Sequence, residues 1–357
     1  MTTTSRPPIT RVLATVDWSE KHRRGLAELF APAEVRFAKR SERGEVLREL
    51  ERVEVAVIKG TIDEAYLKAP RLRWVHCDQS GLDSFAPPHL FDTGLMVTSS
   101  AGRSGPVLAE HALFFMLALC YRFPLQYRAQ RLRVWGTPGQ EATRGLYGRS
   151  ICIVGIGGTG TELARMCLAL NMDVTVYRRR ALPSPVPGVR LFSKDAGDHV
   201  GDALDGAEFL ALCASLNDES YHLIGREEIA RMRRGGFIVN VARAQLVDMD
   251  AMADALRSGQ LGGAGSDVLD PDEPLSPFHR AWSLPNMLIT PHVTPQMPDR
   301  AARTLEIVTE NHRRYLAGEP LINQLTRRDA FTPRARGRGP GGLGERAYRY
   351  LARLFLR

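Results

Sequence analysis

The sequence of 357 residues is 25% charged and 44% hydrophobic, a composition typical of an ordinary globular protein. Its length exceeds the usual size of one hydrophobic core, so we expect two domains. The formal net charge of +8 does not indicate a nucleic-acid-binding fold, because nine arginines and only two acidic residues lie from Arg327 to the C-terminus. The rest of the chain is nearly neutral, and we expect no nucleic-acid partner.

The sequence also argues against a membrane-spanning segment and against a metal site. The longest apolar run, ALFFMLALC at 112–120, is far too short to span a bilayer, and the N-terminal segment lacks the pattern of a signal peptide. The five cysteines lie in apolar segments and form no Cys-x-x-Cys pair, which predicts buried thiols and no metal site. These features favour a cytoplasmic protein without a transmembrane segment.

The first hundred residues alternate short apolar runs with helix-like segments, a pattern typical of βα repetition and a parallel sheet. The apolar runs are RVLATV, EVRFA, VEVAVI, LRWVHC and LMVTSS. After a turn at 103–106, the long apolar segment 107–125 is predicted to be one helix that begins near Pro106 and bridges two lobes.

A glycine-rich turn follows the apolar strand that begins at Ile151, and a helical stretch and a second strand, DVTVY, come after it. This order is typical of a dinucleotide-binding βαβ unit, in which the diphosphate lies on the N-terminus of the helix. We expect Gly155 to provide the turn's dihedral angles, Gly157 the close approach of the pyrophosphate, and Gly160 the packing of helix on strand. The cofactor-binding residues predicted in this turn are Gly155, Gly157, Gly158, Thr159 and Gly160.

The second strand of this unit ends on three arginines, 178–180, where NAD-binding units usually place an acidic residue for the ribose hydroxyls. Guanidinium groups suit a 2′-phosphate, so Arg178 and Arg179 predict NADP(H) as the preferred cofactor and NAD(H) as the alternative. The ordinary interpretation of such a triplet is a solvated strand end.

Further strands at AEFLALC, FIVNVA, GGAGSDVL and MLITPH continue the Rossmann pattern, and a helix at 297–319 would return the chain to the first lobe. We therefore expect a discontinuous substrate domain, 1–103 with 296–326, and a Rossmann domain at 104–295. Residues 327–357 form a basic tail that ends in the amphipathic pattern RAYRYLARLFLR. Packing on a dimer or disorder is favoured for this tail over contact with an anionic surface.

Three polar residues follow predicted strands of the Rossmann domain: Arg243 after FIVNVA, Glu273 after SDVLDPD and His292 after MLITP. Loops at the carboxyl ends of parallel strands converge on the ligand, so these side chains can meet. Reduction of a ketone by a nicotinamide needs a proton donor, a cation that holds a carboxylate, and a group that keeps the donor protonated. Each residue alone would more often be structural, and the other histidines, including His111, are treated as structural.

From about Trp74 to Asn323 the sequence resembles the D-isomer-specific 2-hydroxyacid dehydrogenase family, and within it the NADPH-preferring glyoxylate and hydroxypyruvate reductases. The matching motifs are SGLD (80–83), AEHAL (109–113), GIGGTG (155–160), NVARAQLVD (240–248), SDVLDPDEPL (266–275) and TPH (290–292). The resemblance implies a two-lobed α/β fold, with a Rossmann dinucleotide-binding domain inserted into a flavodoxin-like substrate domain. It also implies a homodimer formed around the Rossmann lobe.

By this resemblance Arg243 binds the substrate carboxylate and keto oxygen, His292 is the general acid, and Glu273 raises the proton affinity of His292. The implied activity is reduction of a 2-oxo acid to a D-2-hydroxy acid by NAD(P)H. Oxidation of a phosphite or phosphoglycerate type of substrate is an alternative within the family, whereas Glu273 argues against a formate dehydrogenase. The alternative of another class is a corepressor-like, nucleotide-sensing interaction protein.

The resemblance also places the main-chain amides around Gly81 and Leu82 against the substrate carboxylate, and Asp267 near the nicotinamide carboxamide. The segment after Asp267 has one residue more than the family pattern. Counting forward from Asp267 selects Asp272 as the partner of the histidine, whereas counting back from the histidine selects Glu273, which we prefer. Two other departures, which would reshape the pocket or weaken catalysis, are Ala244 and Ser215-Leu216.

Overall fold

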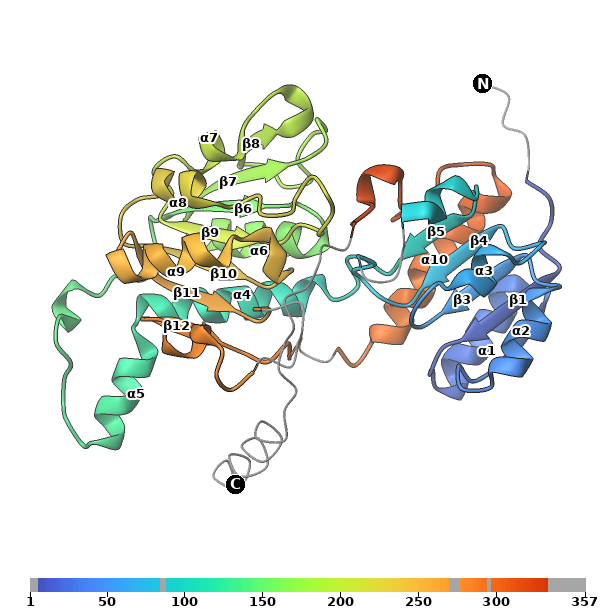
Figure 1. Cartoon of the computed structure of the whole chain (residues 1–357), viewed down its shortest axis with the longest axis horizontal. Coiled ribbons are helices and arrows are strands. Elements are labelled where there is room, and N and C mark those ends of the chain that lie inside the picture. Colours follow the sequence, from blue (N-terminus) through green and yellow to red (C-terminus); the bar gives the residue numbers. More distant parts are fainter. Residues whose placement is uncertain (1–5, 84–87, 270–275, 294–296, 333–357) are drawn as a thin grey trace. The chain divides into compact units, whose positions relative to one another are not determined.

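The computed structural model describes residues 6–83, 88–269, 276–293 and 297–332. The chain divides into two compact units, and each contains one parallel sheet (Figure 1). The first unit comprises the described residues within 1–104, 217–219 and 296–333, and the second comprises those within 105–216 and 220–295. The predicted α/β class is therefore confirmed.

The first unit has a five-stranded sheet in the order β2-β1-β3-β4-β5. All neighbouring strands are parallel, and this order is the flavodoxin-like one. The strands are β1 (Arg11–Thr15), β2 (Glu34–Phe37), β3 (Val55–Ile58), β4 (Trp74–Cys77) and β5 (Met96–Ser99). The helices are α1 (Glu20–Phe30), α2 (Arg43–Leu50), α3 (Glu64–Leu67) and α10 (Arg300–Leu316).

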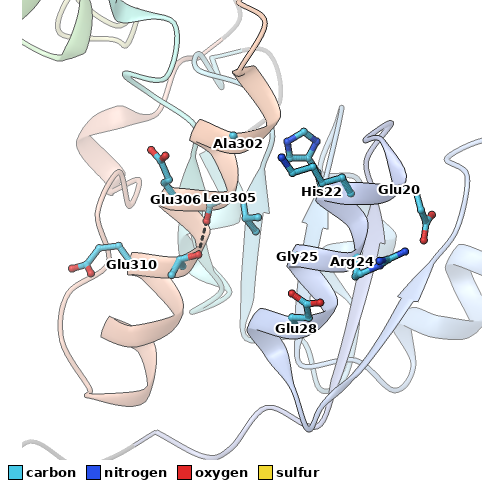
Figure 2. Close-up of a pocket in the computed structure, with 11 residues that line it drawn as sticks. Glu20, His22, Arg24, Gly25, Glu28, Ala302, Leu305, Glu306 and Glu310 are labelled. Carbon is cyan, nitrogen blue, oxygen red and sulfur yellow. Dashed lines mark hydrogen bonds between the residues drawn. The ribbon is translucent and has the colours of Figure 1, made fainter.

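A groove of about 1020 Å³ lies between α1 and α10 of this unit (Figure 2). The two helices approach closely at Gly25, where an added Cβ would lie 2.9 Å from the Leu305 side chain. The acidic side chains that line the groove are Glu20, Glu28, Glu306 and Glu310. None of the predicted site residues that the structure describes lies among the lining residues, so the groove is separate from these residues.

The second unit has a seven-stranded parallel sheet in the order β12-β11-β10-β9-β6-β7-β8. Counted from β6, the first six strands have the Rossmann order 3-2-1-4-5-6, and β12 extends the sheet by one strand. The strands are β6 (Ser150–Val154), β7 (Asp173–Arg178), β8 (Arg190–Ser193), β9 (Phe209–Leu212), β10 (Gly236–Asn240), β11 (Leu261–Ser266) and β12 (Met287–Ile289). The helices are α4 (Gly105–Cys120), α5 (Phe123–Arg131), α6 (Gly158–Ala169), α7 (Val200–Leu204), α8 (Arg226–Arg231) and α9 (Met249–Ser258).

The helix predicted at 107–125 is interrupted, and this prediction was wrong. α4 ends at Cys120, and α5 begins at Phe123 after a bend of 63°. Arg122 has a φ of 49°, and Pro124 lies in the first turn of α5. Proline cannot donate the hydrogen bond that a continuous helix needs at this position, so the chain starts a new helix instead.

No single helix of the described residues is long and apolar enough to cross a membrane, although α4 and α5 together pass that test as a bent pair. Four of the five cysteines are buried, and Cys213 is partly buried. Burial raises the pKa of the Cys77, Cys152 and Cys167 thiols to about 12. These thiols are therefore protonated and unreactive near neutral pH.

Candidate active site

The glycine turn between β6 and α6 is shaped by steric limits at two of its glycines. Gly155 has a φ of 95°, and an added Cβ would lie 2.7 Å from the backbone of Ala214. At Gly160 an added Cβ would lie 1.9 Å from the carbonyl oxygen of Gly155, so no side chain fits. A Cβ at Gly157, the N-cap of α6, would meet no atom of the described residues within 4 Å. The turn therefore leaves open space at the helix N-terminus, where a diphosphate binds in dinucleotide folds.

The arginines at the end of β7 are held by the loop that follows them. Nη1 of Arg178 donates hydrogen bonds to the carbonyl oxygens of Leu182 (3.3 Å) and Pro183 (3.2 Å). Partial burial and the neighbouring Arg180 lower the pKa of Arg178. The backbone carbonyl of Arg179 accepts a hydrogen bond from the amide of Asp195 at 2.9 Å. Positive charge is thus concentrated beside the strand end that lies next to the glycine turn.

Three adjacent strands bring the predicted reactive positions to one edge of the second sheet. Asn240 of β10 pairs with Ser266 of β11, which in turn pairs with Ile289 of β12. The predicted site residues that follow these paired residues within three positions are Arg243, Asp267 and His292. The parallel register therefore places all three loops at the carboxyl edge, which is the ligand-binding edge of open α/β sheets.

Asp267 organises the loop that carries the predicted histidine. Its side chain is only 1% exposed, and its Oδ1 accepts hydrogen bonds from the Thr290 hydroxyl (2.5 Å) and the Val293 amide (3.0 Å). The amide of Asp267 donates to the carbonyl oxygen of Asn240 at 3.0 Å, which ties this loop to β10. A buried carboxylate needs such donors to offset its desolvation.

His111 of α4 contacts the same loop, and the sequence predicted a structural role for it. Its Nε2 lies 3.2 Å from the Thr290 hydroxyl, and its Nδ1 lies 4.0 Å from Oδ2 of Asp267. The hydroxyl group of Thr290 donates its only hydrogen to Asp267. Nε2 of His111 must therefore be the donor in its hydrogen bond to the Thr290 hydroxyl oxygen. The ring stacks on Phe115 at 4.8 Å. The AEHAL motif was the only sequence signal for this residue.

His292 is solvent-exposed and follows β12 in a left-handed backbone conformation, with a φ of 52°. This conformation costs about 1–3 kcal/mol for a residue other than glycine, and such strain is concentrated at functional sites. The amide of His292 donates to the carbonyl oxygens of Asp267 (3.0 Å) and Thr290 (3.1 Å), which hold the loop in place. The two candidates for its acidic partner, Glu273 and Asp272, lie outside the described residues.

Arg243 is half-buried in the turn after β10. Asn240 shapes this turn, because its side chain accepts a hydrogen bond from the Ala242 amide (3.0 Å) and donates one to the carbonyl oxygen of Arg243 (2.9 Å). Nη1 of Arg243 donates to the carbonyl oxygen of Ala242 at 2.8 Å. The backbone of the turn is therefore held by the buried amide side chain of Asn240 and by the arginine head group itself.

Gly81 and Leu82 lie in the loop after β4 of the first unit. The hydroxyl of Ser80 donates a hydrogen bond to the carbonyl oxygen of Ser100 (3.2 Å). The amide of Ser100 donates one to the carbonyl oxygen of Gln79 (2.9 Å). Among the described residues, no hydrogen bond is donated by the amides of Gly81 and Leu82. Leu82 packs its side chain into the core of this unit. These features suit a loop that presents its amides to an anion.

The fold and the glycine turn define a dinucleotide-binding protein, and comparison with known proteins gives its family and its class of reaction. The family model described as "D-isomer specific 2-hydroxyacid dehydrogenase, NAD binding domain" matches residues 113–294, just over half of the chain. Glyoxylate reductase of Korarchaeum cryptofilum (strain OPF8) is 30% identical over 283 residues, which cover 76% of this chain and 82% of that protein. D-3-phosphoglycerate dehydrogenase of Mycobacterium leprae (strain TN) is 29% identical over 303 residues, 82% of this chain and 55% of that protein.

A solved structure shows the same similarity. The D-isomer specific 2-hydroxyacid dehydrogenase from Xanthobacter autotrophicus Py2, in complex with NADPH and MES, is 27% identical, with a TM-score of 0.72 and coverage of 90% of this chain and 99% of that one. The chain belongs to the D-isomer specific 2-hydroxyacid dehydrogenase family. It is an NAD(P)-dependent enzyme that acts on small 2-oxo or 2-hydroxy acids, as the sequence motifs predicted.

Proposed function

We propose that this enzyme reduces a 2-oxo acid to a D-2-hydroxy acid with NADPH, and that His292 is its general acid and base. The observation that carries the proposal is the register of β10, β11 and β12. This register gathers Arg243, Asp267 and His292 at the carboxyl edge of the sheet that also carries the glycine turn. The roles below extend the family's activity to individual residues of this chain.

In the proposed reaction, a bound NADPH would supply a hydride to the carbonyl carbon. Protonated His292 donates its proton to the carbonyl oxygen, so that the C=O group becomes an alcohol and NADP⁺ remains. Arg243 binds the carboxylate and polarises the carbonyl. In the reverse direction, neutral His292 removes the proton from the hydroxyl group. Asp267 maintains the conformation of the histidine loop.

The proposal is tested by His292→Ala, which should lower kcat for glyoxylate or hydroxypyruvate about 10²–10⁴-fold. Its NADPH affinity, measured by fluorescence titration, should stay close to that of the wild type. His199→Ala is the matched control, because this exposed histidine makes no side-chain capping bond at the start of α7. Turnover of the correct substrate by His292→Ala at the wild-type rate would refute the assignment.

The acidic partner of His292 is proposed to be Glu273. An adjacent carboxylate stabilises the protonated imidazole, so Glu273→Gln should move the loss of reductase activity to lower pH. Asp272→Asn should leave the pH profile unchanged. The reverse pattern would transfer the role to Asp272, and two unchanged profiles would rule out both residues.

A preference for NADP(H) over NAD(H) is proposed from the cluster of arginines at 178–180. Arg178 is held at the end of β7 by two backbone carbonyls, and this orders the guanidinium before a cofactor binds. Arg178→Gln should lower the ratio of kcat/KM for NADPH to that for NADH about tenfold. Arg165→Gln, an exposed arginine of α6 that pairs with Glu162, should leave the ratio unchanged. An unchanged ratio in Arg178→Gln would contradict the proposed preference.

We also propose that the chain forms a homodimer through α4, α5 and the loop that follows. These segments expose large apolar side chains, and such clusters mark interaction surfaces. The exposed residues are Phe114, Leu117, Tyr121, Phe123, Tyr127, Leu132, Val134 and Trp135. Phe123→Asp should shift the mass measured by light scattering toward the monomer, whereas Leu47→Asp on α2 should not. A monomeric wild type would contradict this proposal.

Oxidation of phosphoglycerate remains a second candidate, because a phosphoglycerate dehydrogenase is also similar to the chain. Steady-state rates with glyoxylate, hydroxypyruvate, pyruvate, bulkier 2-oxo acids, 3-phosphoglycerate and phosphite would distinguish these activities. The proposed reductase predicts the highest kcat/KM with an unphosphorylated 2-oxo acid.

A further inference from the structure

Helix α4 begins against the glycine turn of the same unit. Its first residue, Gly105, is buried. A Cβ added to Gly105 would lie 2.8 Å from the carbonyl carbon of Gly158 and 3.2 Å from the amide nitrogen of Thr159. Gly158 and Thr159 are the first two residues of α6, at the end of the helix where a dinucleotide places its diphosphate. The absence of a side chain at position 105 therefore lets the two helices begin closer together than any other residue would permit.

The conformation of α4 does not require glycine at this position. Gly105 is not among the glycines with a positive φ, and alanine is favoured over glycine within helices. Gly155 differs, because its φ of 95° requires glycine whatever the space around it. The requirement at position 105 is therefore steric, and it comes from the backbone of α6.

The two helices cannot relieve this contact by moving apart, because they share one hydrophobic core. Ala109 and Ala112 of α4 belong to the same buried cluster as Leu163 and Ala164 of α6, and all four are completely buried. In a close-packed core, separation of the helices would open voids, which are costly. A side chain at position 105 therefore displaces the first turn of α6 rather than the whole helix.

The contact at Gly105 also places two helix N-termini side by side. Neither α4 nor α6 has an acidic residue in its first turn. The N-terminus of a helix carries a partial positive charge, which favours a nearby anion. The two partial charges therefore add at the place where the diphosphate binds, and no carboxylate of either first turn opposes them.

We propose that Gly105 is a positioning residue for the dinucleotide. Its missing side chain sets the place of the Gly158 and Thr159 amides and keeps the N-terminus of α4 beside the diphosphate. Carbon atoms in contact lie about 3.5–4.0 Å apart, so Gly105→Ala must displace the first turn of α6 by roughly 0.7 Å or more. This role concerns the diphosphate, which NADPH and NADH share. It rests on the family's use of a nicotinamide dinucleotide and is independent of the roles proposed for His292 and Arg178.

The steric part of the proposal is tested by fluorescence titration of the full chain with NADPH and with NADH. Gly105→Ala should weaken the binding of both about tenfold, because the amides that bind the diphosphate are displaced, and the ratio of the two affinities should stay unchanged. Gly236→Ala is the matched control, since its Cβ would lie 2.9 Å from the carbonyl oxygen of Arg233. Gly236 is the first residue of β10, at the edge of the parallel sheet opposite to the glycine turn. This control should lower the Tm and leave both affinities unchanged.

The electrostatic part is tested at Ser104, which precedes the first residue of α4. Asp and Asn are both favourable before the first residue of a helix, so Ser104→Asp and Ser104→Asn should preserve α4. Ser104→Asp should bind both cofactors about tenfold more weakly than Ser104→Asn at low salt, and the difference should shrink at high salt, because its carboxylate repels the diphosphate. This comparison decides the question if Gly105→Ala does not fold.

Unchanged cofactor affinities in Gly105→Ala would overturn the proposal, and so would an equal loss of affinity in Gly236→Ala. Equal affinities of Ser104→Asp and Ser104→Asn would overturn it too. A loss confined to NADPH in Gly105→Ala would place the effect at the 2′-phosphate and would also overturn it. Melting curves of each variant, compared with the wild type, separate loss of the site from loss of the fold. Because binding is measured and not turnover, a wrong role for His292 would leave these results unaffected.

Discussion

Thr290→Val tests whether the buried group of Asp267, Thr290 and His111 holds the histidine loop in place. Valine has nearly the same shape as threonine, so the change removes a hydroxyl group and leaves little cavity. The hydroxyl donates to Oδ1 of Asp267 at 2.5 Å and lies 3.2 Å from Nε2 of His111. After the substitution, the carboxylate retains the Val293 amide as a donor, whereas the histidine loses its acceptor.

The cost of this substitution follows from the burial of the carboxylate, whose side chain is 1% exposed. A hydrogen bond to a charged group contributes about 1.5–3 kcal/mol, and the bond lost by the histidine adds about 1 kcal/mol. We therefore expect a loss of roughly 2–4 kcal/mol in the free energy of unfolding of the second unit. For a unit of this size, that corresponds to a Tm lower by roughly 5–12 °C.

Differential scanning calorimetry of the cofactor-free protein measures this shift, and kcat measures the accompanying displacement of His292. Thr309→Val is the control, because the hydroxyl of this exposed threonine donates to the carbonyl oxygen of Leu305 at 2.7 Å and serves no buried charge. The control should change stability by less than about 0.5 kcal/mol. A Tm for Thr290→Val within 2 °C of the wild type, on the order of the control's effect, would refute the reasoning.

Three further predictions concern buried groups. Burial lowers the pKa of His76 to about 3, so between pH 6.5 and 3 the unfolded chain binds a proton that the folded state excludes, and stability falls as the pH decreases. The free energy of unfolding measured in urea should decline less steeply with decreasing pH in His76→Leu, by up to about 1.4 kcal/mol per pH unit. Equal slopes in the variant and the wild type would contradict the lowered pKa of His76. Gly160→Ala should weaken NADPH binding at least about tenfold in fluorescence titrations, as its Cβ would lie 1.9 Å from a carbonyl oxygen, whereas Gly44→Ala on α2 should not. Glu208→Gln should lower the free energy of unfolding by about 3–5 kcal/mol, because it leaves a buried arginine unpaired, whereas Glu162→Gln at an exposed pair should change it by less than about 1 kcal/mol.

The sequence by itself determined the α/β class, the glycine turn and the family. These features depend on local signals, because strand and helix periods extend over a few residues and a turn's dihedral requirements belong to single positions. Gly155 and Gly160 show this, since the structure excludes a side chain at both. The local pattern failed to predict the end of the helix near Arg122. The apolar run continues past this point, whereas the left-handed conformation of Arg122 and the proline at 124 end one helix and start another.

Only the tertiary structure decided which distant side chains share one environment. His111 and Thr290 are 179 positions apart, and no local pattern relates them. The same holds for Glu208 and its arginines, which come from separate segments and meet where the strands of one sheet begin. Such contacts depend on the order and register of the strands, which are set by packing of the whole sheet. Sequence therefore specified the elements, and packing specified the polar groups that those elements bring together.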